Sequence, residues 1–164
     1  HDALTGLPNQ LLMQDRLQQA IAFSNRMGTK VALMVLDIDR FKAVNDFLGH
    51  DAGNRMLVAV AQRLRGNLRG TDTVCRQGGD EYLLLLTNLA EPDAVVTFLG
   101  ELQESFREPF RIDNAEMVIS VSVGVTMYPE DGADFGTPGF VRLNFGTRRA
   151  LLYEALARLR VACA

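Results

Sequence analysis

The 164 residues of the chain suit a single globular domain, and a content of 48% apolar and 23% charged residues excludes a disordered chain. The net charge of −3, from 17 basic and 20 acidic residues, argues against a nonspecific nucleic-acid binder. No apolar run reaches the roughly 18 residues that a membrane-spanning helix needs. The first residue is not Met, so we expect a fragment of a longer protein.

The first half of the chain predicts two helices around a buried strand. Residues 8–28 place apolar side chains at helical spacing between a proline, which favours helix starts, and a glycine, which favours helix ends. Residues 31–38 form a nearly continuous apolar run, which is typical of a strand buried on both faces. Helical spacing returns at 52–68, where we expect the second helix.

The second half predicts more strands. Glycines between two strand-like runs indicate a hairpin, and alternating β-branched residues indicate a further strand. We expect strands at 73–76 and 82–87, a helix at 92–108, a strand at 117–127 paired with 111–113 across a turn at Asn114, a loop at 131–139 and a helix at 147–161. The alternation predicts an α/β or α+β fold with a mixed central sheet flanked by helices.

Two pairs of carboxylates fall at the ends of predicted strands. Asp37 and Asp39 end the buried apolar strand, and Asp80 and Glu81 lie at the tip of the hairpin. Strand ends are common ligand sites in α/β folds, and adjacent strands would bring the two pairs together. Converging carboxylates can hold Mg²⁺, a hard cation that takes oxygen ligands and shares them with substrate phosphates.

Each motif also has a simpler interpretation. A Gly-Gly-Asp-Glu hairpin by itself is usually a polar turn, and an Asp-x-Asp pair after a strand is usually a cap. In a binding site, Gly78 and Gly79 would instead let the backbone approach a bulky ligand closely. The presence of both motifs in this order shifts the balance towards a site, although spacing alone leaves both interpretations open.

Several ordered motifs resemble those of the GGDEF-domain diguanylate cyclases. Together they span residues 1 to about 132. They are DALTGLPN at 2–9, DIDRFKAVND at 37–46, GHDAG at 49–53, RQGGDEY at 76–82, SVGV at 122–125 and YPEDG at 128–132. The resemblance implies a fold related to the palm of the class III nucleotide cyclases. It also implies one GGDEF domain over residues 1–164, with an atypical segment from about 133.

The activity that the resemblance implies is condensation of two GTP into cyclic di-GMP with release of two pyrophosphates. Asp37 and Glu81 would ligate Mg²⁺ or Mn²⁺, assisted by the carbonyl group of Ile38. Asp80 would activate or position the attacking 3′-hydroxyl, so that Asp80 and Glu81 are the expected catalytic pair. A carboxylate near a metal has a low pKa, which leaves full general-base action by Asp80 open.

The resemblance also implies a set of substrate-binding residues. Asn45 would hydrogen-bond guanine, and the ammonium group of Lys42 with nearby backbone N–H groups would face the phosphates. For Phe41, packing in the core is the simpler interpretation. The full expected set is Phe41, Lys42, Asn45, Asn54, Gly78, Gly79 and Arg160.

A product-feedback site is implied by an Arg-x-x-Asp pattern ahead of the hairpin. Arg69 and Asp72 stand at the spacing of the inhibitory site of the family, where such a pair binds cyclic di-GMP. A guanidinium group can donate to phosphate or guanine acceptors, and a carboxylate can accept from guanine N–H groups. The simpler interpretation is a solvated arginine and an aspartate that caps a turn.

The sequence departs from the family pattern at several positions. Asn54 stands where the family often has Asp, and an amide offers guanine one acceptor atom in place of two. Gln77 stands where an aromatic or aliphatic residue is common, and we expect little effect. In the last predicted helix, Arg149 replaces an Asp and Leu156 replaces a phosphate-contacting Lys, while Arg160 fits the pattern.

Three functions remain open on these grounds: an active cyclase, a module that binds GTP or cyclic di-GMP and regulates a neighbouring domain, and a structural remnant used for dimerisation. The complete hairpin tip favours the first. The expected partners are GTP, cyclic di-GMP, a second copy for catalysis and an N-terminal sensor domain, without nucleic acid. The unpatterned spacing of Cys75 and Cys163 favours a reducing, cytoplasmic setting, which is compatible with a membrane anchor elsewhere in the full-length protein.

Overall fold

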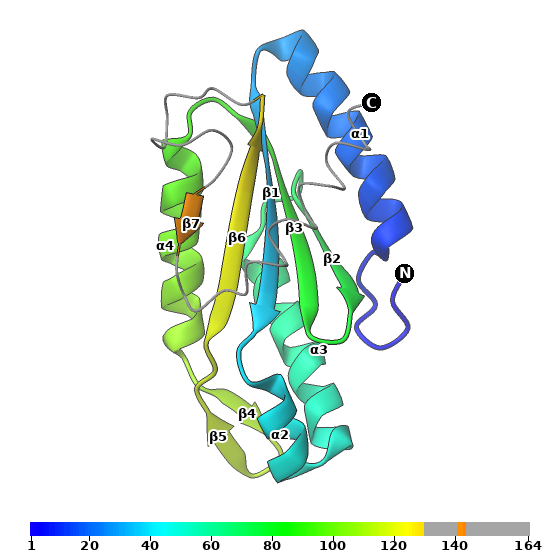
Figure 1. Cartoon of the computed structure of the whole chain (residues 1–164), viewed down its shortest axis with the longest axis vertical. Coiled ribbons are helices and arrows are strands. Elements are labelled where there is room, and N and C mark those ends of the chain that lie inside the picture. Colours follow the sequence, from blue (N-terminus) through cyan, green and yellow to red (C-terminus); the bar gives the residue numbers. More distant parts are fainter. Residues whose placement is uncertain (130–140, 144–164) are drawn as a thin grey trace.

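The computed structural model describes residues 1–129 and 141–143. They form a five-stranded sheet with helices on both faces and a small two-stranded sheet at one end (Figure 1). The helices are α1 (Gln10–Met27), α2 (Phe41–Leu48), α3 (His50–Asn67) and α4 (Asp93–Arg107). The strands are β1 (Lys30–Ile38), β2 (Thr73–Gly78), β3 (Glu81–Leu89), β4 (Phe110–Ile112), β5 (Ala115–Met117), β6 (Val121–Tyr128) and β7 (Val141–Leu143).

The large sheet has the strand order β2-β3-β1-β6-β7, and all pairings in the described part of the chain are antiparallel. The alternation of strands and helices predicts a mixed sheet, because helices usually connect parallel neighbours. Here α2 and α3 connect β1 to β2, which are parallel to each other, but β3 returns between them. The predicted α+β class with a helix-flanked sheet is confirmed, and its described strands are antiparallel to their neighbours.

Strand β1 is buried on both faces, as its apolar run predicts. Met34 and Leu36 pack on the side of α3 and α4, whereas Leu33 and Val35 pack on the side of α1. Each such side chain, when fully buried, contributes about 1.5–3 kcal/mol to the free energy of unfolding. The carboxyl end of β1 is therefore anchored by two apolar cores, and the catalytic candidates lie at that end.

Helix α1 forms within the predicted range and has caps at both ends. The Oδ1 atom of Asn9 accepts a hydrogen bond from the Leu12 N–H at 3.1 Å. Gly28 ends the helix with a left-handed φ of 67°, which glycine adopts without steric cost. Pro8 precedes the N-cap, so α1 begins two residues later than its predicted start.

Helix α2 is not predicted from the sequence, and the reason is its length and burial. It has eight residues, of which Phe41 is the buried one, so it lacks the repeated apolar stripe that identifies longer helices. It follows Arg40, whose φ is 56°, and its C-cap is Gly49. The next helix, α3, begins at once and therefore starts two residues before its predicted limit.

The predicted strand at 117–127 is wrong as a single element. The chain forms β5 up to Met117 and then β6 from Val121, with a break at 118–120. The expected partner segment does form a strand, β4, and pairs with β5 across the predicted turn, with Arg111 opposite Glu116. The β-branched alternation continues through the break, which is why the sequence does not reveal it.

The predicted loop at 131–139 and helix at 147–161 lie outside the described residues, together with Arg149, Leu156 and Arg160. Among the helices that are described, none combines the length and the apolar character that crossing a membrane requires.

Candidate functional site

Two of the predicted site residues face each other across neighbouring strands. Asp37 of β1 pairs directly with Glu81 of β3 in the antiparallel register. Side chains of directly opposed residues lie on the same face of a sheet, with Cβ atoms about 4.5–5.5 Å apart. Asp80 precedes Glu81 in the turn between β2 and β3, and its carbonyl oxygen accepts a hydrogen bond from the Ile38 N–H at 3.3 Å. The fold therefore brings three of the predicted carboxylates together at one end of the strands β1 and β3.

The hairpin depends on its two glycines and on an arginine. Gly78 and Gly79 have φ values of 147° and 55°, conformations that residues with a side chain rarely adopt. Arg76 donates from Nε and Nη2 to the Gly79 carbonyl oxygen, at 3.0 and 2.7 Å. The same guanidinium forms an ion pair with Asp2 at 3.0 Å. The tip is thus held both by its own strand and by the amino-terminal segment.

Asp37 has a strongly perturbed environment. Its pKa rises from 3.8 to about 7, chiefly because burial disfavours the charged form, and next because Asp80 adds a negative charge and a hydrogen bond. Glu81 and Asp39 raise the pKa further through their charges. The buried Oδ1 atom of Asp37 has no hydrogen-bond partner in the described structure. Such an arrangement of like charges is favourable when a cation offsets it.

The donor set fits a magnesium-type ion. Within residues 1–129 and 141–143, no group of three or more His, Cys, Asp or Glu side chains is arranged as a metal site. Mg²⁺ does not require one, because it commonly takes one or two carboxylates and completes its shell with water and substrate phosphates. The orphaned oxygen of Asp37 and the opposing carboxylate of Glu81 meet that requirement.

Asp39 has a structural role, in agreement with the simpler interpretation of the Asp-x-Asp pair. Its Oδ2 atom accepts from the Ser120 hydroxyl and its Oδ1 atom from the Ser122 hydroxyl, both at 2.6 Å. The Asp39 N–H donates to the Ser120 carbonyl oxygen at 3.0 Å. These bonds fasten the end of β1 to the start of β6.

The expected substrate-binding residues of the first half lie on α2 and α3. Phe41 is buried in the core, which supports packing as its role. Lys42 is exposed in the first turn of α2, and Asn45 is half-buried one turn further on. Asn54 is exposed near the start of α3. Arg160 belongs to the undescribed part of the chain, so its place relative to this group stays a prediction.

Gln77 contacts the site, although the sequence predicts little effect of this residue. A bulge between Arg76 and Gly78 interrupts the pairing of β2 with β3 at this position. Bulges redirect side chains beside active sites. The Gln77 amide donates to the Oε2 atom of Glu81 at 3.2 Å. The glycines after Gln77 were the available signal, because glycine near a strand end often marks a bulge.

Arg69 and Asp72 line a separate pocket of about 380 Å³, which Arg16 and Arg65 also line. The carboxylate of Asp72 accepts hydrogen bonds from the backbone N–H groups of Arg69 and Thr87, both at 3.1 Å. Asp72 therefore caps a turn, as the simpler interpretation predicts. Each carboxylate oxygen can accept a second bond, so this structural role leaves room for a ligand.

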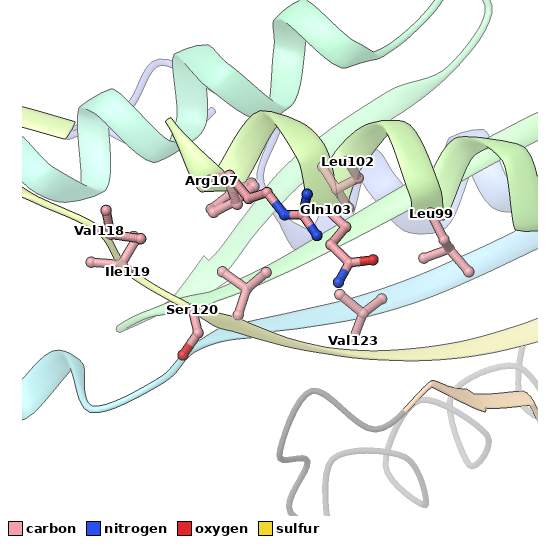
Figure 2. Close-up of a pocket in the computed structure, with 10 residues that line it drawn as sticks. Leu99, Leu102, Gln103, Arg107, Val118, Ile119, Ser120 and Val123 are labelled. Carbon is pink, nitrogen blue, oxygen red and sulfur yellow. The ribbon is translucent and has the colours of Figure 1, made fainter. Parts of the chain in front are cut away.

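A smaller cavity of about 200 Å³ lies between α4 and the segment that leads into β6 (Figure 2). Leu102 and Val123 are among its apolar walls, and Gln103 and Arg107 contribute polar groups from α4. Among the described residues its lining contains no carboxylate and none of the catalytic candidates.

The sequence matches the family model described as diguanylate cyclase, GGDEF domain, over residues 1–137. The chain belongs to the GGDEF family. The bifunctional diguanylate cyclase/cyclic di-GMP phosphodiesterase MucR of Pseudomonas aeruginosa is 44% identical over 132 residues, which are 80% of this chain and 19% of MucR. The diguanylate cyclase TpbB of the same organism is 40% identical over 131 residues, 79% of this chain and 30% of TpbB. The GGDEF chain thus spans less than a third of either relative.

Solved GGDEF structures share the fold. A structure of the TpbB GGDEF domain superposes with a TM-score of 0.78 at 34% identity, covering 99% of this chain and 87% of that one. The GGDEF domain of DgcB from Caulobacter crescentus, solved in complex with c-di-GMP, gives a TM-score of 0.69 at 32% identity, with 77% and 75% covered. The family resemblance of the sequence motifs is therefore confirmed by sequence and by fold.

Proposed function

We propose that this GGDEF domain is an active diguanylate cyclase, which condenses two GTP into cyclic di-GMP and releases two pyrophosphates. The observation that carries the proposal is the direct pairing of Asp37 with Glu81, beside Asp80 and with an unpartnered Asp37 oxygen. A degenerate domain would have little reason to retain half-buried like charges, which cost stability unless a cation offsets them.

In this proposal Asp37 and Glu81 hold Mg²⁺ or Mn²⁺, with the Ile38 carbonyl group as a further ligand. The bound ion supplies neutralisation of triphosphate charge, the main electrostatic requirement of phosphoryl-type transfer. Asp80 orients the 3′-hydroxyl, which attacks the α-phosphate of the partner GTP while pyrophosphate leaves. The hydrogen bonds from Arg76 to the Gly79 carbonyl oxygen keep this tip in one conformation.

The substrate would lie along α2 and the start of α3. Asn45 and Asn54 hydrogen-bond guanine, while Lys42 and the first N–H groups of α2 face the phosphates. Because Gly78 and Gly79 have no side chains, the hairpin backbone can approach the nucleotide closely. Arg160 is the expected further phosphate ligand by family resemblance.

Catalysis requires two domains, because each bound GTP supplies one nucleophile and one leaving group. We therefore propose a homodimer that forms around the two substrates. We also propose product feedback at Arg69 and Asp72, supported by the cationic pocket that includes Arg16 and Arg65. This chain covers only 19% and 30% of its longer relatives, and one solved neighbour is a sensory box/GGDEF family protein, so we also propose a sensor domain on the amino-terminal side of the full-length protein. The cytoplasmic location of this domain stays a proposal from its cysteine pattern.

The deciding experiment measures cyclic di-GMP formation from GTP and Mg²⁺ at several protein concentrations by chromatography. A rate that rises faster than linearly with protein is expected, since the active species contains two chains. Absence of product at all concentrations, with GTP still binding, would reject the cyclase in favour of a regulatory module. Asn54 is the observation that favours this second candidate, because its amide offers guanine fewer acceptors than a carboxylate.

A further inference from the structure

Gly53 leaves room for the side chain of Asn45 where α3 packs against α2. A Cβ atom at position 53 would lie 1.8 Å from the Asn45 Oδ1 atom and 3.0 Å from its Cγ atom. The same Cβ would lie 3.4 Å from the Cζ atom of Phe41. Real contacts of a Cβ atom begin near the last of these distances, so Asn45 and a side chain at 53 exclude each other in this arrangement.

Asn45 is the side that would have to move. Phe41 is 9% exposed and belongs to the core, so its ring has little space to withdraw. The backbone between the two helices is also fixed, because Gly49 donates to the Asn45 carbonyl oxygen and Gly53 donates to the Gly49 carbonyl oxygen. The Asn45 side chain is half-buried, so part of it faces open space. A different rotamer is therefore its available response.

We propose that Gly53 is a specificity-determining positioning residue, whose missing side chain leaves the space that the Asn45 amide needs for the orientation that reads guanine. The inference rests on the proposed function, in which Asn45 hydrogen-bonds the base. Gly53 touches no nucleotide itself and acts through Asn45. Discrimination of guanine from adenine then depends on one methyl-sized space between α2 and α3.

Helix propensity makes this proposal separable from an ordinary structural role. Gly53 lies inside α3, where alanine is the better helix former. Its φ is not in the left-handed region, so the backbone itself would accept a side chain. Gly100 in α4 is a matched control, because it is also inside a helix and its Cβ would meet nothing within 4 Å. Gly53→Ala and Gly100→Ala share the propensity gain and differ in the contact with Asn45.

The first test compares these variants in the full chain by calorimetric titration with GTP and with ATP in Mg²⁺. We expect Gly53→Ala to weaken GTP binding about tenfold, the effect of about one lost hydrogen bond, and to leave ATP binding unchanged. Gly100→Ala should match the wild type with both nucleotides. Asn45→Ala should weaken GTP binding similarly, and adding Gly53→Ala to it should cause no further loss, because both changes remove one interaction. Additive losses, or unchanged GTP binding in Gly53→Ala, would overturn the proposal.

The second test needs no nucleotide and separates this proposal from the proposed function. NMR of the free protein follows the side-chain NH₂ signals of Asn45, which should shift in Gly53→Ala and stay in place in Gly100→Ala. Unmoved signals in Gly53→Ala would refute the positioning role even if the enzyme is a cyclase. If the signals shift in Gly53→Ala but the wild-type protein does not bind GTP, the steric contact between residues 53 and 45 stands, and its role in guanine recognition is refuted. If Gly53→Ala fails to fold, recovery of folding in Asn45→Ala/Gly53→Ala would support the contact, and continued failure would refute it.

Discussion

Asp37 and Glu81 are direct cross-strand partners, although 43 residues, including two helices and a strand, lie between them in the sequence. Their shared position on one face of the sheet follows from the antiparallel register and requires no loop to hold it. Burial, and next the negative charges around Asp37, raise its pKa to about 7 and so make the stability of the metal-free protein depend on pH.

The first prediction concerns Asp37→Asn in EDTA. Because the folded-state pKa of Asp37 lies above its ordinary value of 3.8, the native state binds more protons than the unfolded state between about pH 4 and 7. The contribution of Asp37 to the free energy of unfolding of the wild type is therefore largest below about pH 4 and decreases as the pH rises to 7. Asn removes the titration, so urea unfolding should find the variant more stable than wild type at pH 8. Equal pH profiles for the two proteins would contradict the assignment.

The second prediction concerns Glu81→Gln. An amide is a poorer metal ligand than a carboxylate, so cyclic di-GMP formation should fall at least about a hundredfold at fixed Mg²⁺. The far-ultraviolet circular dichroism should remain that of wild type. Glu91→Gln, at an exposed position beyond the same strand, is the control and should retain turnover. Wild-type turnover in Glu81→Gln would remove Glu81 from the metal site.

The third prediction tests the contact between Gln77 and Glu81. Met has the length of Gln but cannot donate to the Glu81 Oε2 atom. Loss of this orienting bond should raise the half-saturating Mg²⁺ concentration about threefold to tenfold, with the melting temperature nearly unchanged. Titration of activity with Mg²⁺ in Gln77→Met measures this. An unchanged Mg²⁺ dependence would mean that the bulge redirects Gln77 without consequence for the ion.

The fourth prediction separates the two members of the product pocket. Arg69→Ala should relieve inhibition by cyclic di-GMP and leave initial turnover and stability intact. Asp72→Ala should also relieve inhibition but lose about 1–2 kcal/mol of unfolding free energy, because two backbone N–H groups lose their acceptor. Initial rates with added product, together with urea unfolding, distinguish these effects. Undiminished inhibition in Arg69→Ala would exclude this pocket as the feedback site.

The fifth prediction concerns Arg63 of α3, whose side chain contacts the carboxyl-terminal end of α4. Its guanidinium donates to the carbonyl oxygens of Ser105, Glu108 and Pro109 and lies 3.4 Å from the centroid of the Phe110 ring. Arg63→Met keeps much of the apolar stem but removes these contacts, so unfolding free energy should fall by about 2–3 kcal/mol. Cyclic di-GMP formation below the melting range should be unaffected.

Urea unfolding checks the prediction, and Arg26→Met, at an exposed position of α1, is the control with no expected loss. A loss equal to that of Arg26→Met would show that the Arg63 contacts add no net stability.

The predictable parts of the fold are those that patterning specifies. The apolar run of β1 and the glycines of the hairpin are local signals, and both elements formed where predicted. Helix α2 was not predicted because its single buried residue, Phe41, gives no helical periodicity. The break before Val121 was not predicted because side-chain alternation does not show where the chain changes its strand partner.

The candidate site divides in the same way. The grouping of Asp37 with Glu81 follows from two strand ends, so the sequence predicts it. The separate role of Asp39 depends on the hydroxyl groups of Ser120, just before β6, and Ser122, within β6, which are about eighty residues away in the chain. The role of Gln77 depends on a bulge, whose geometry the sequence signals only through the glycines that follow.

The two-sided burial of β1 also bears on how this domain can change over evolutionary time. Of its nine residues, Lys30 and Asp37 are the ones that are not fully buried. Every substitution between them must satisfy a core, so drift along the strand is confined to apolar exchanges of similar volume. The carboxylate at its end is therefore carried by a strand that tolerates few exchanges, whereas α2, in which Phe41 is the buried residue, is less constrained by packing.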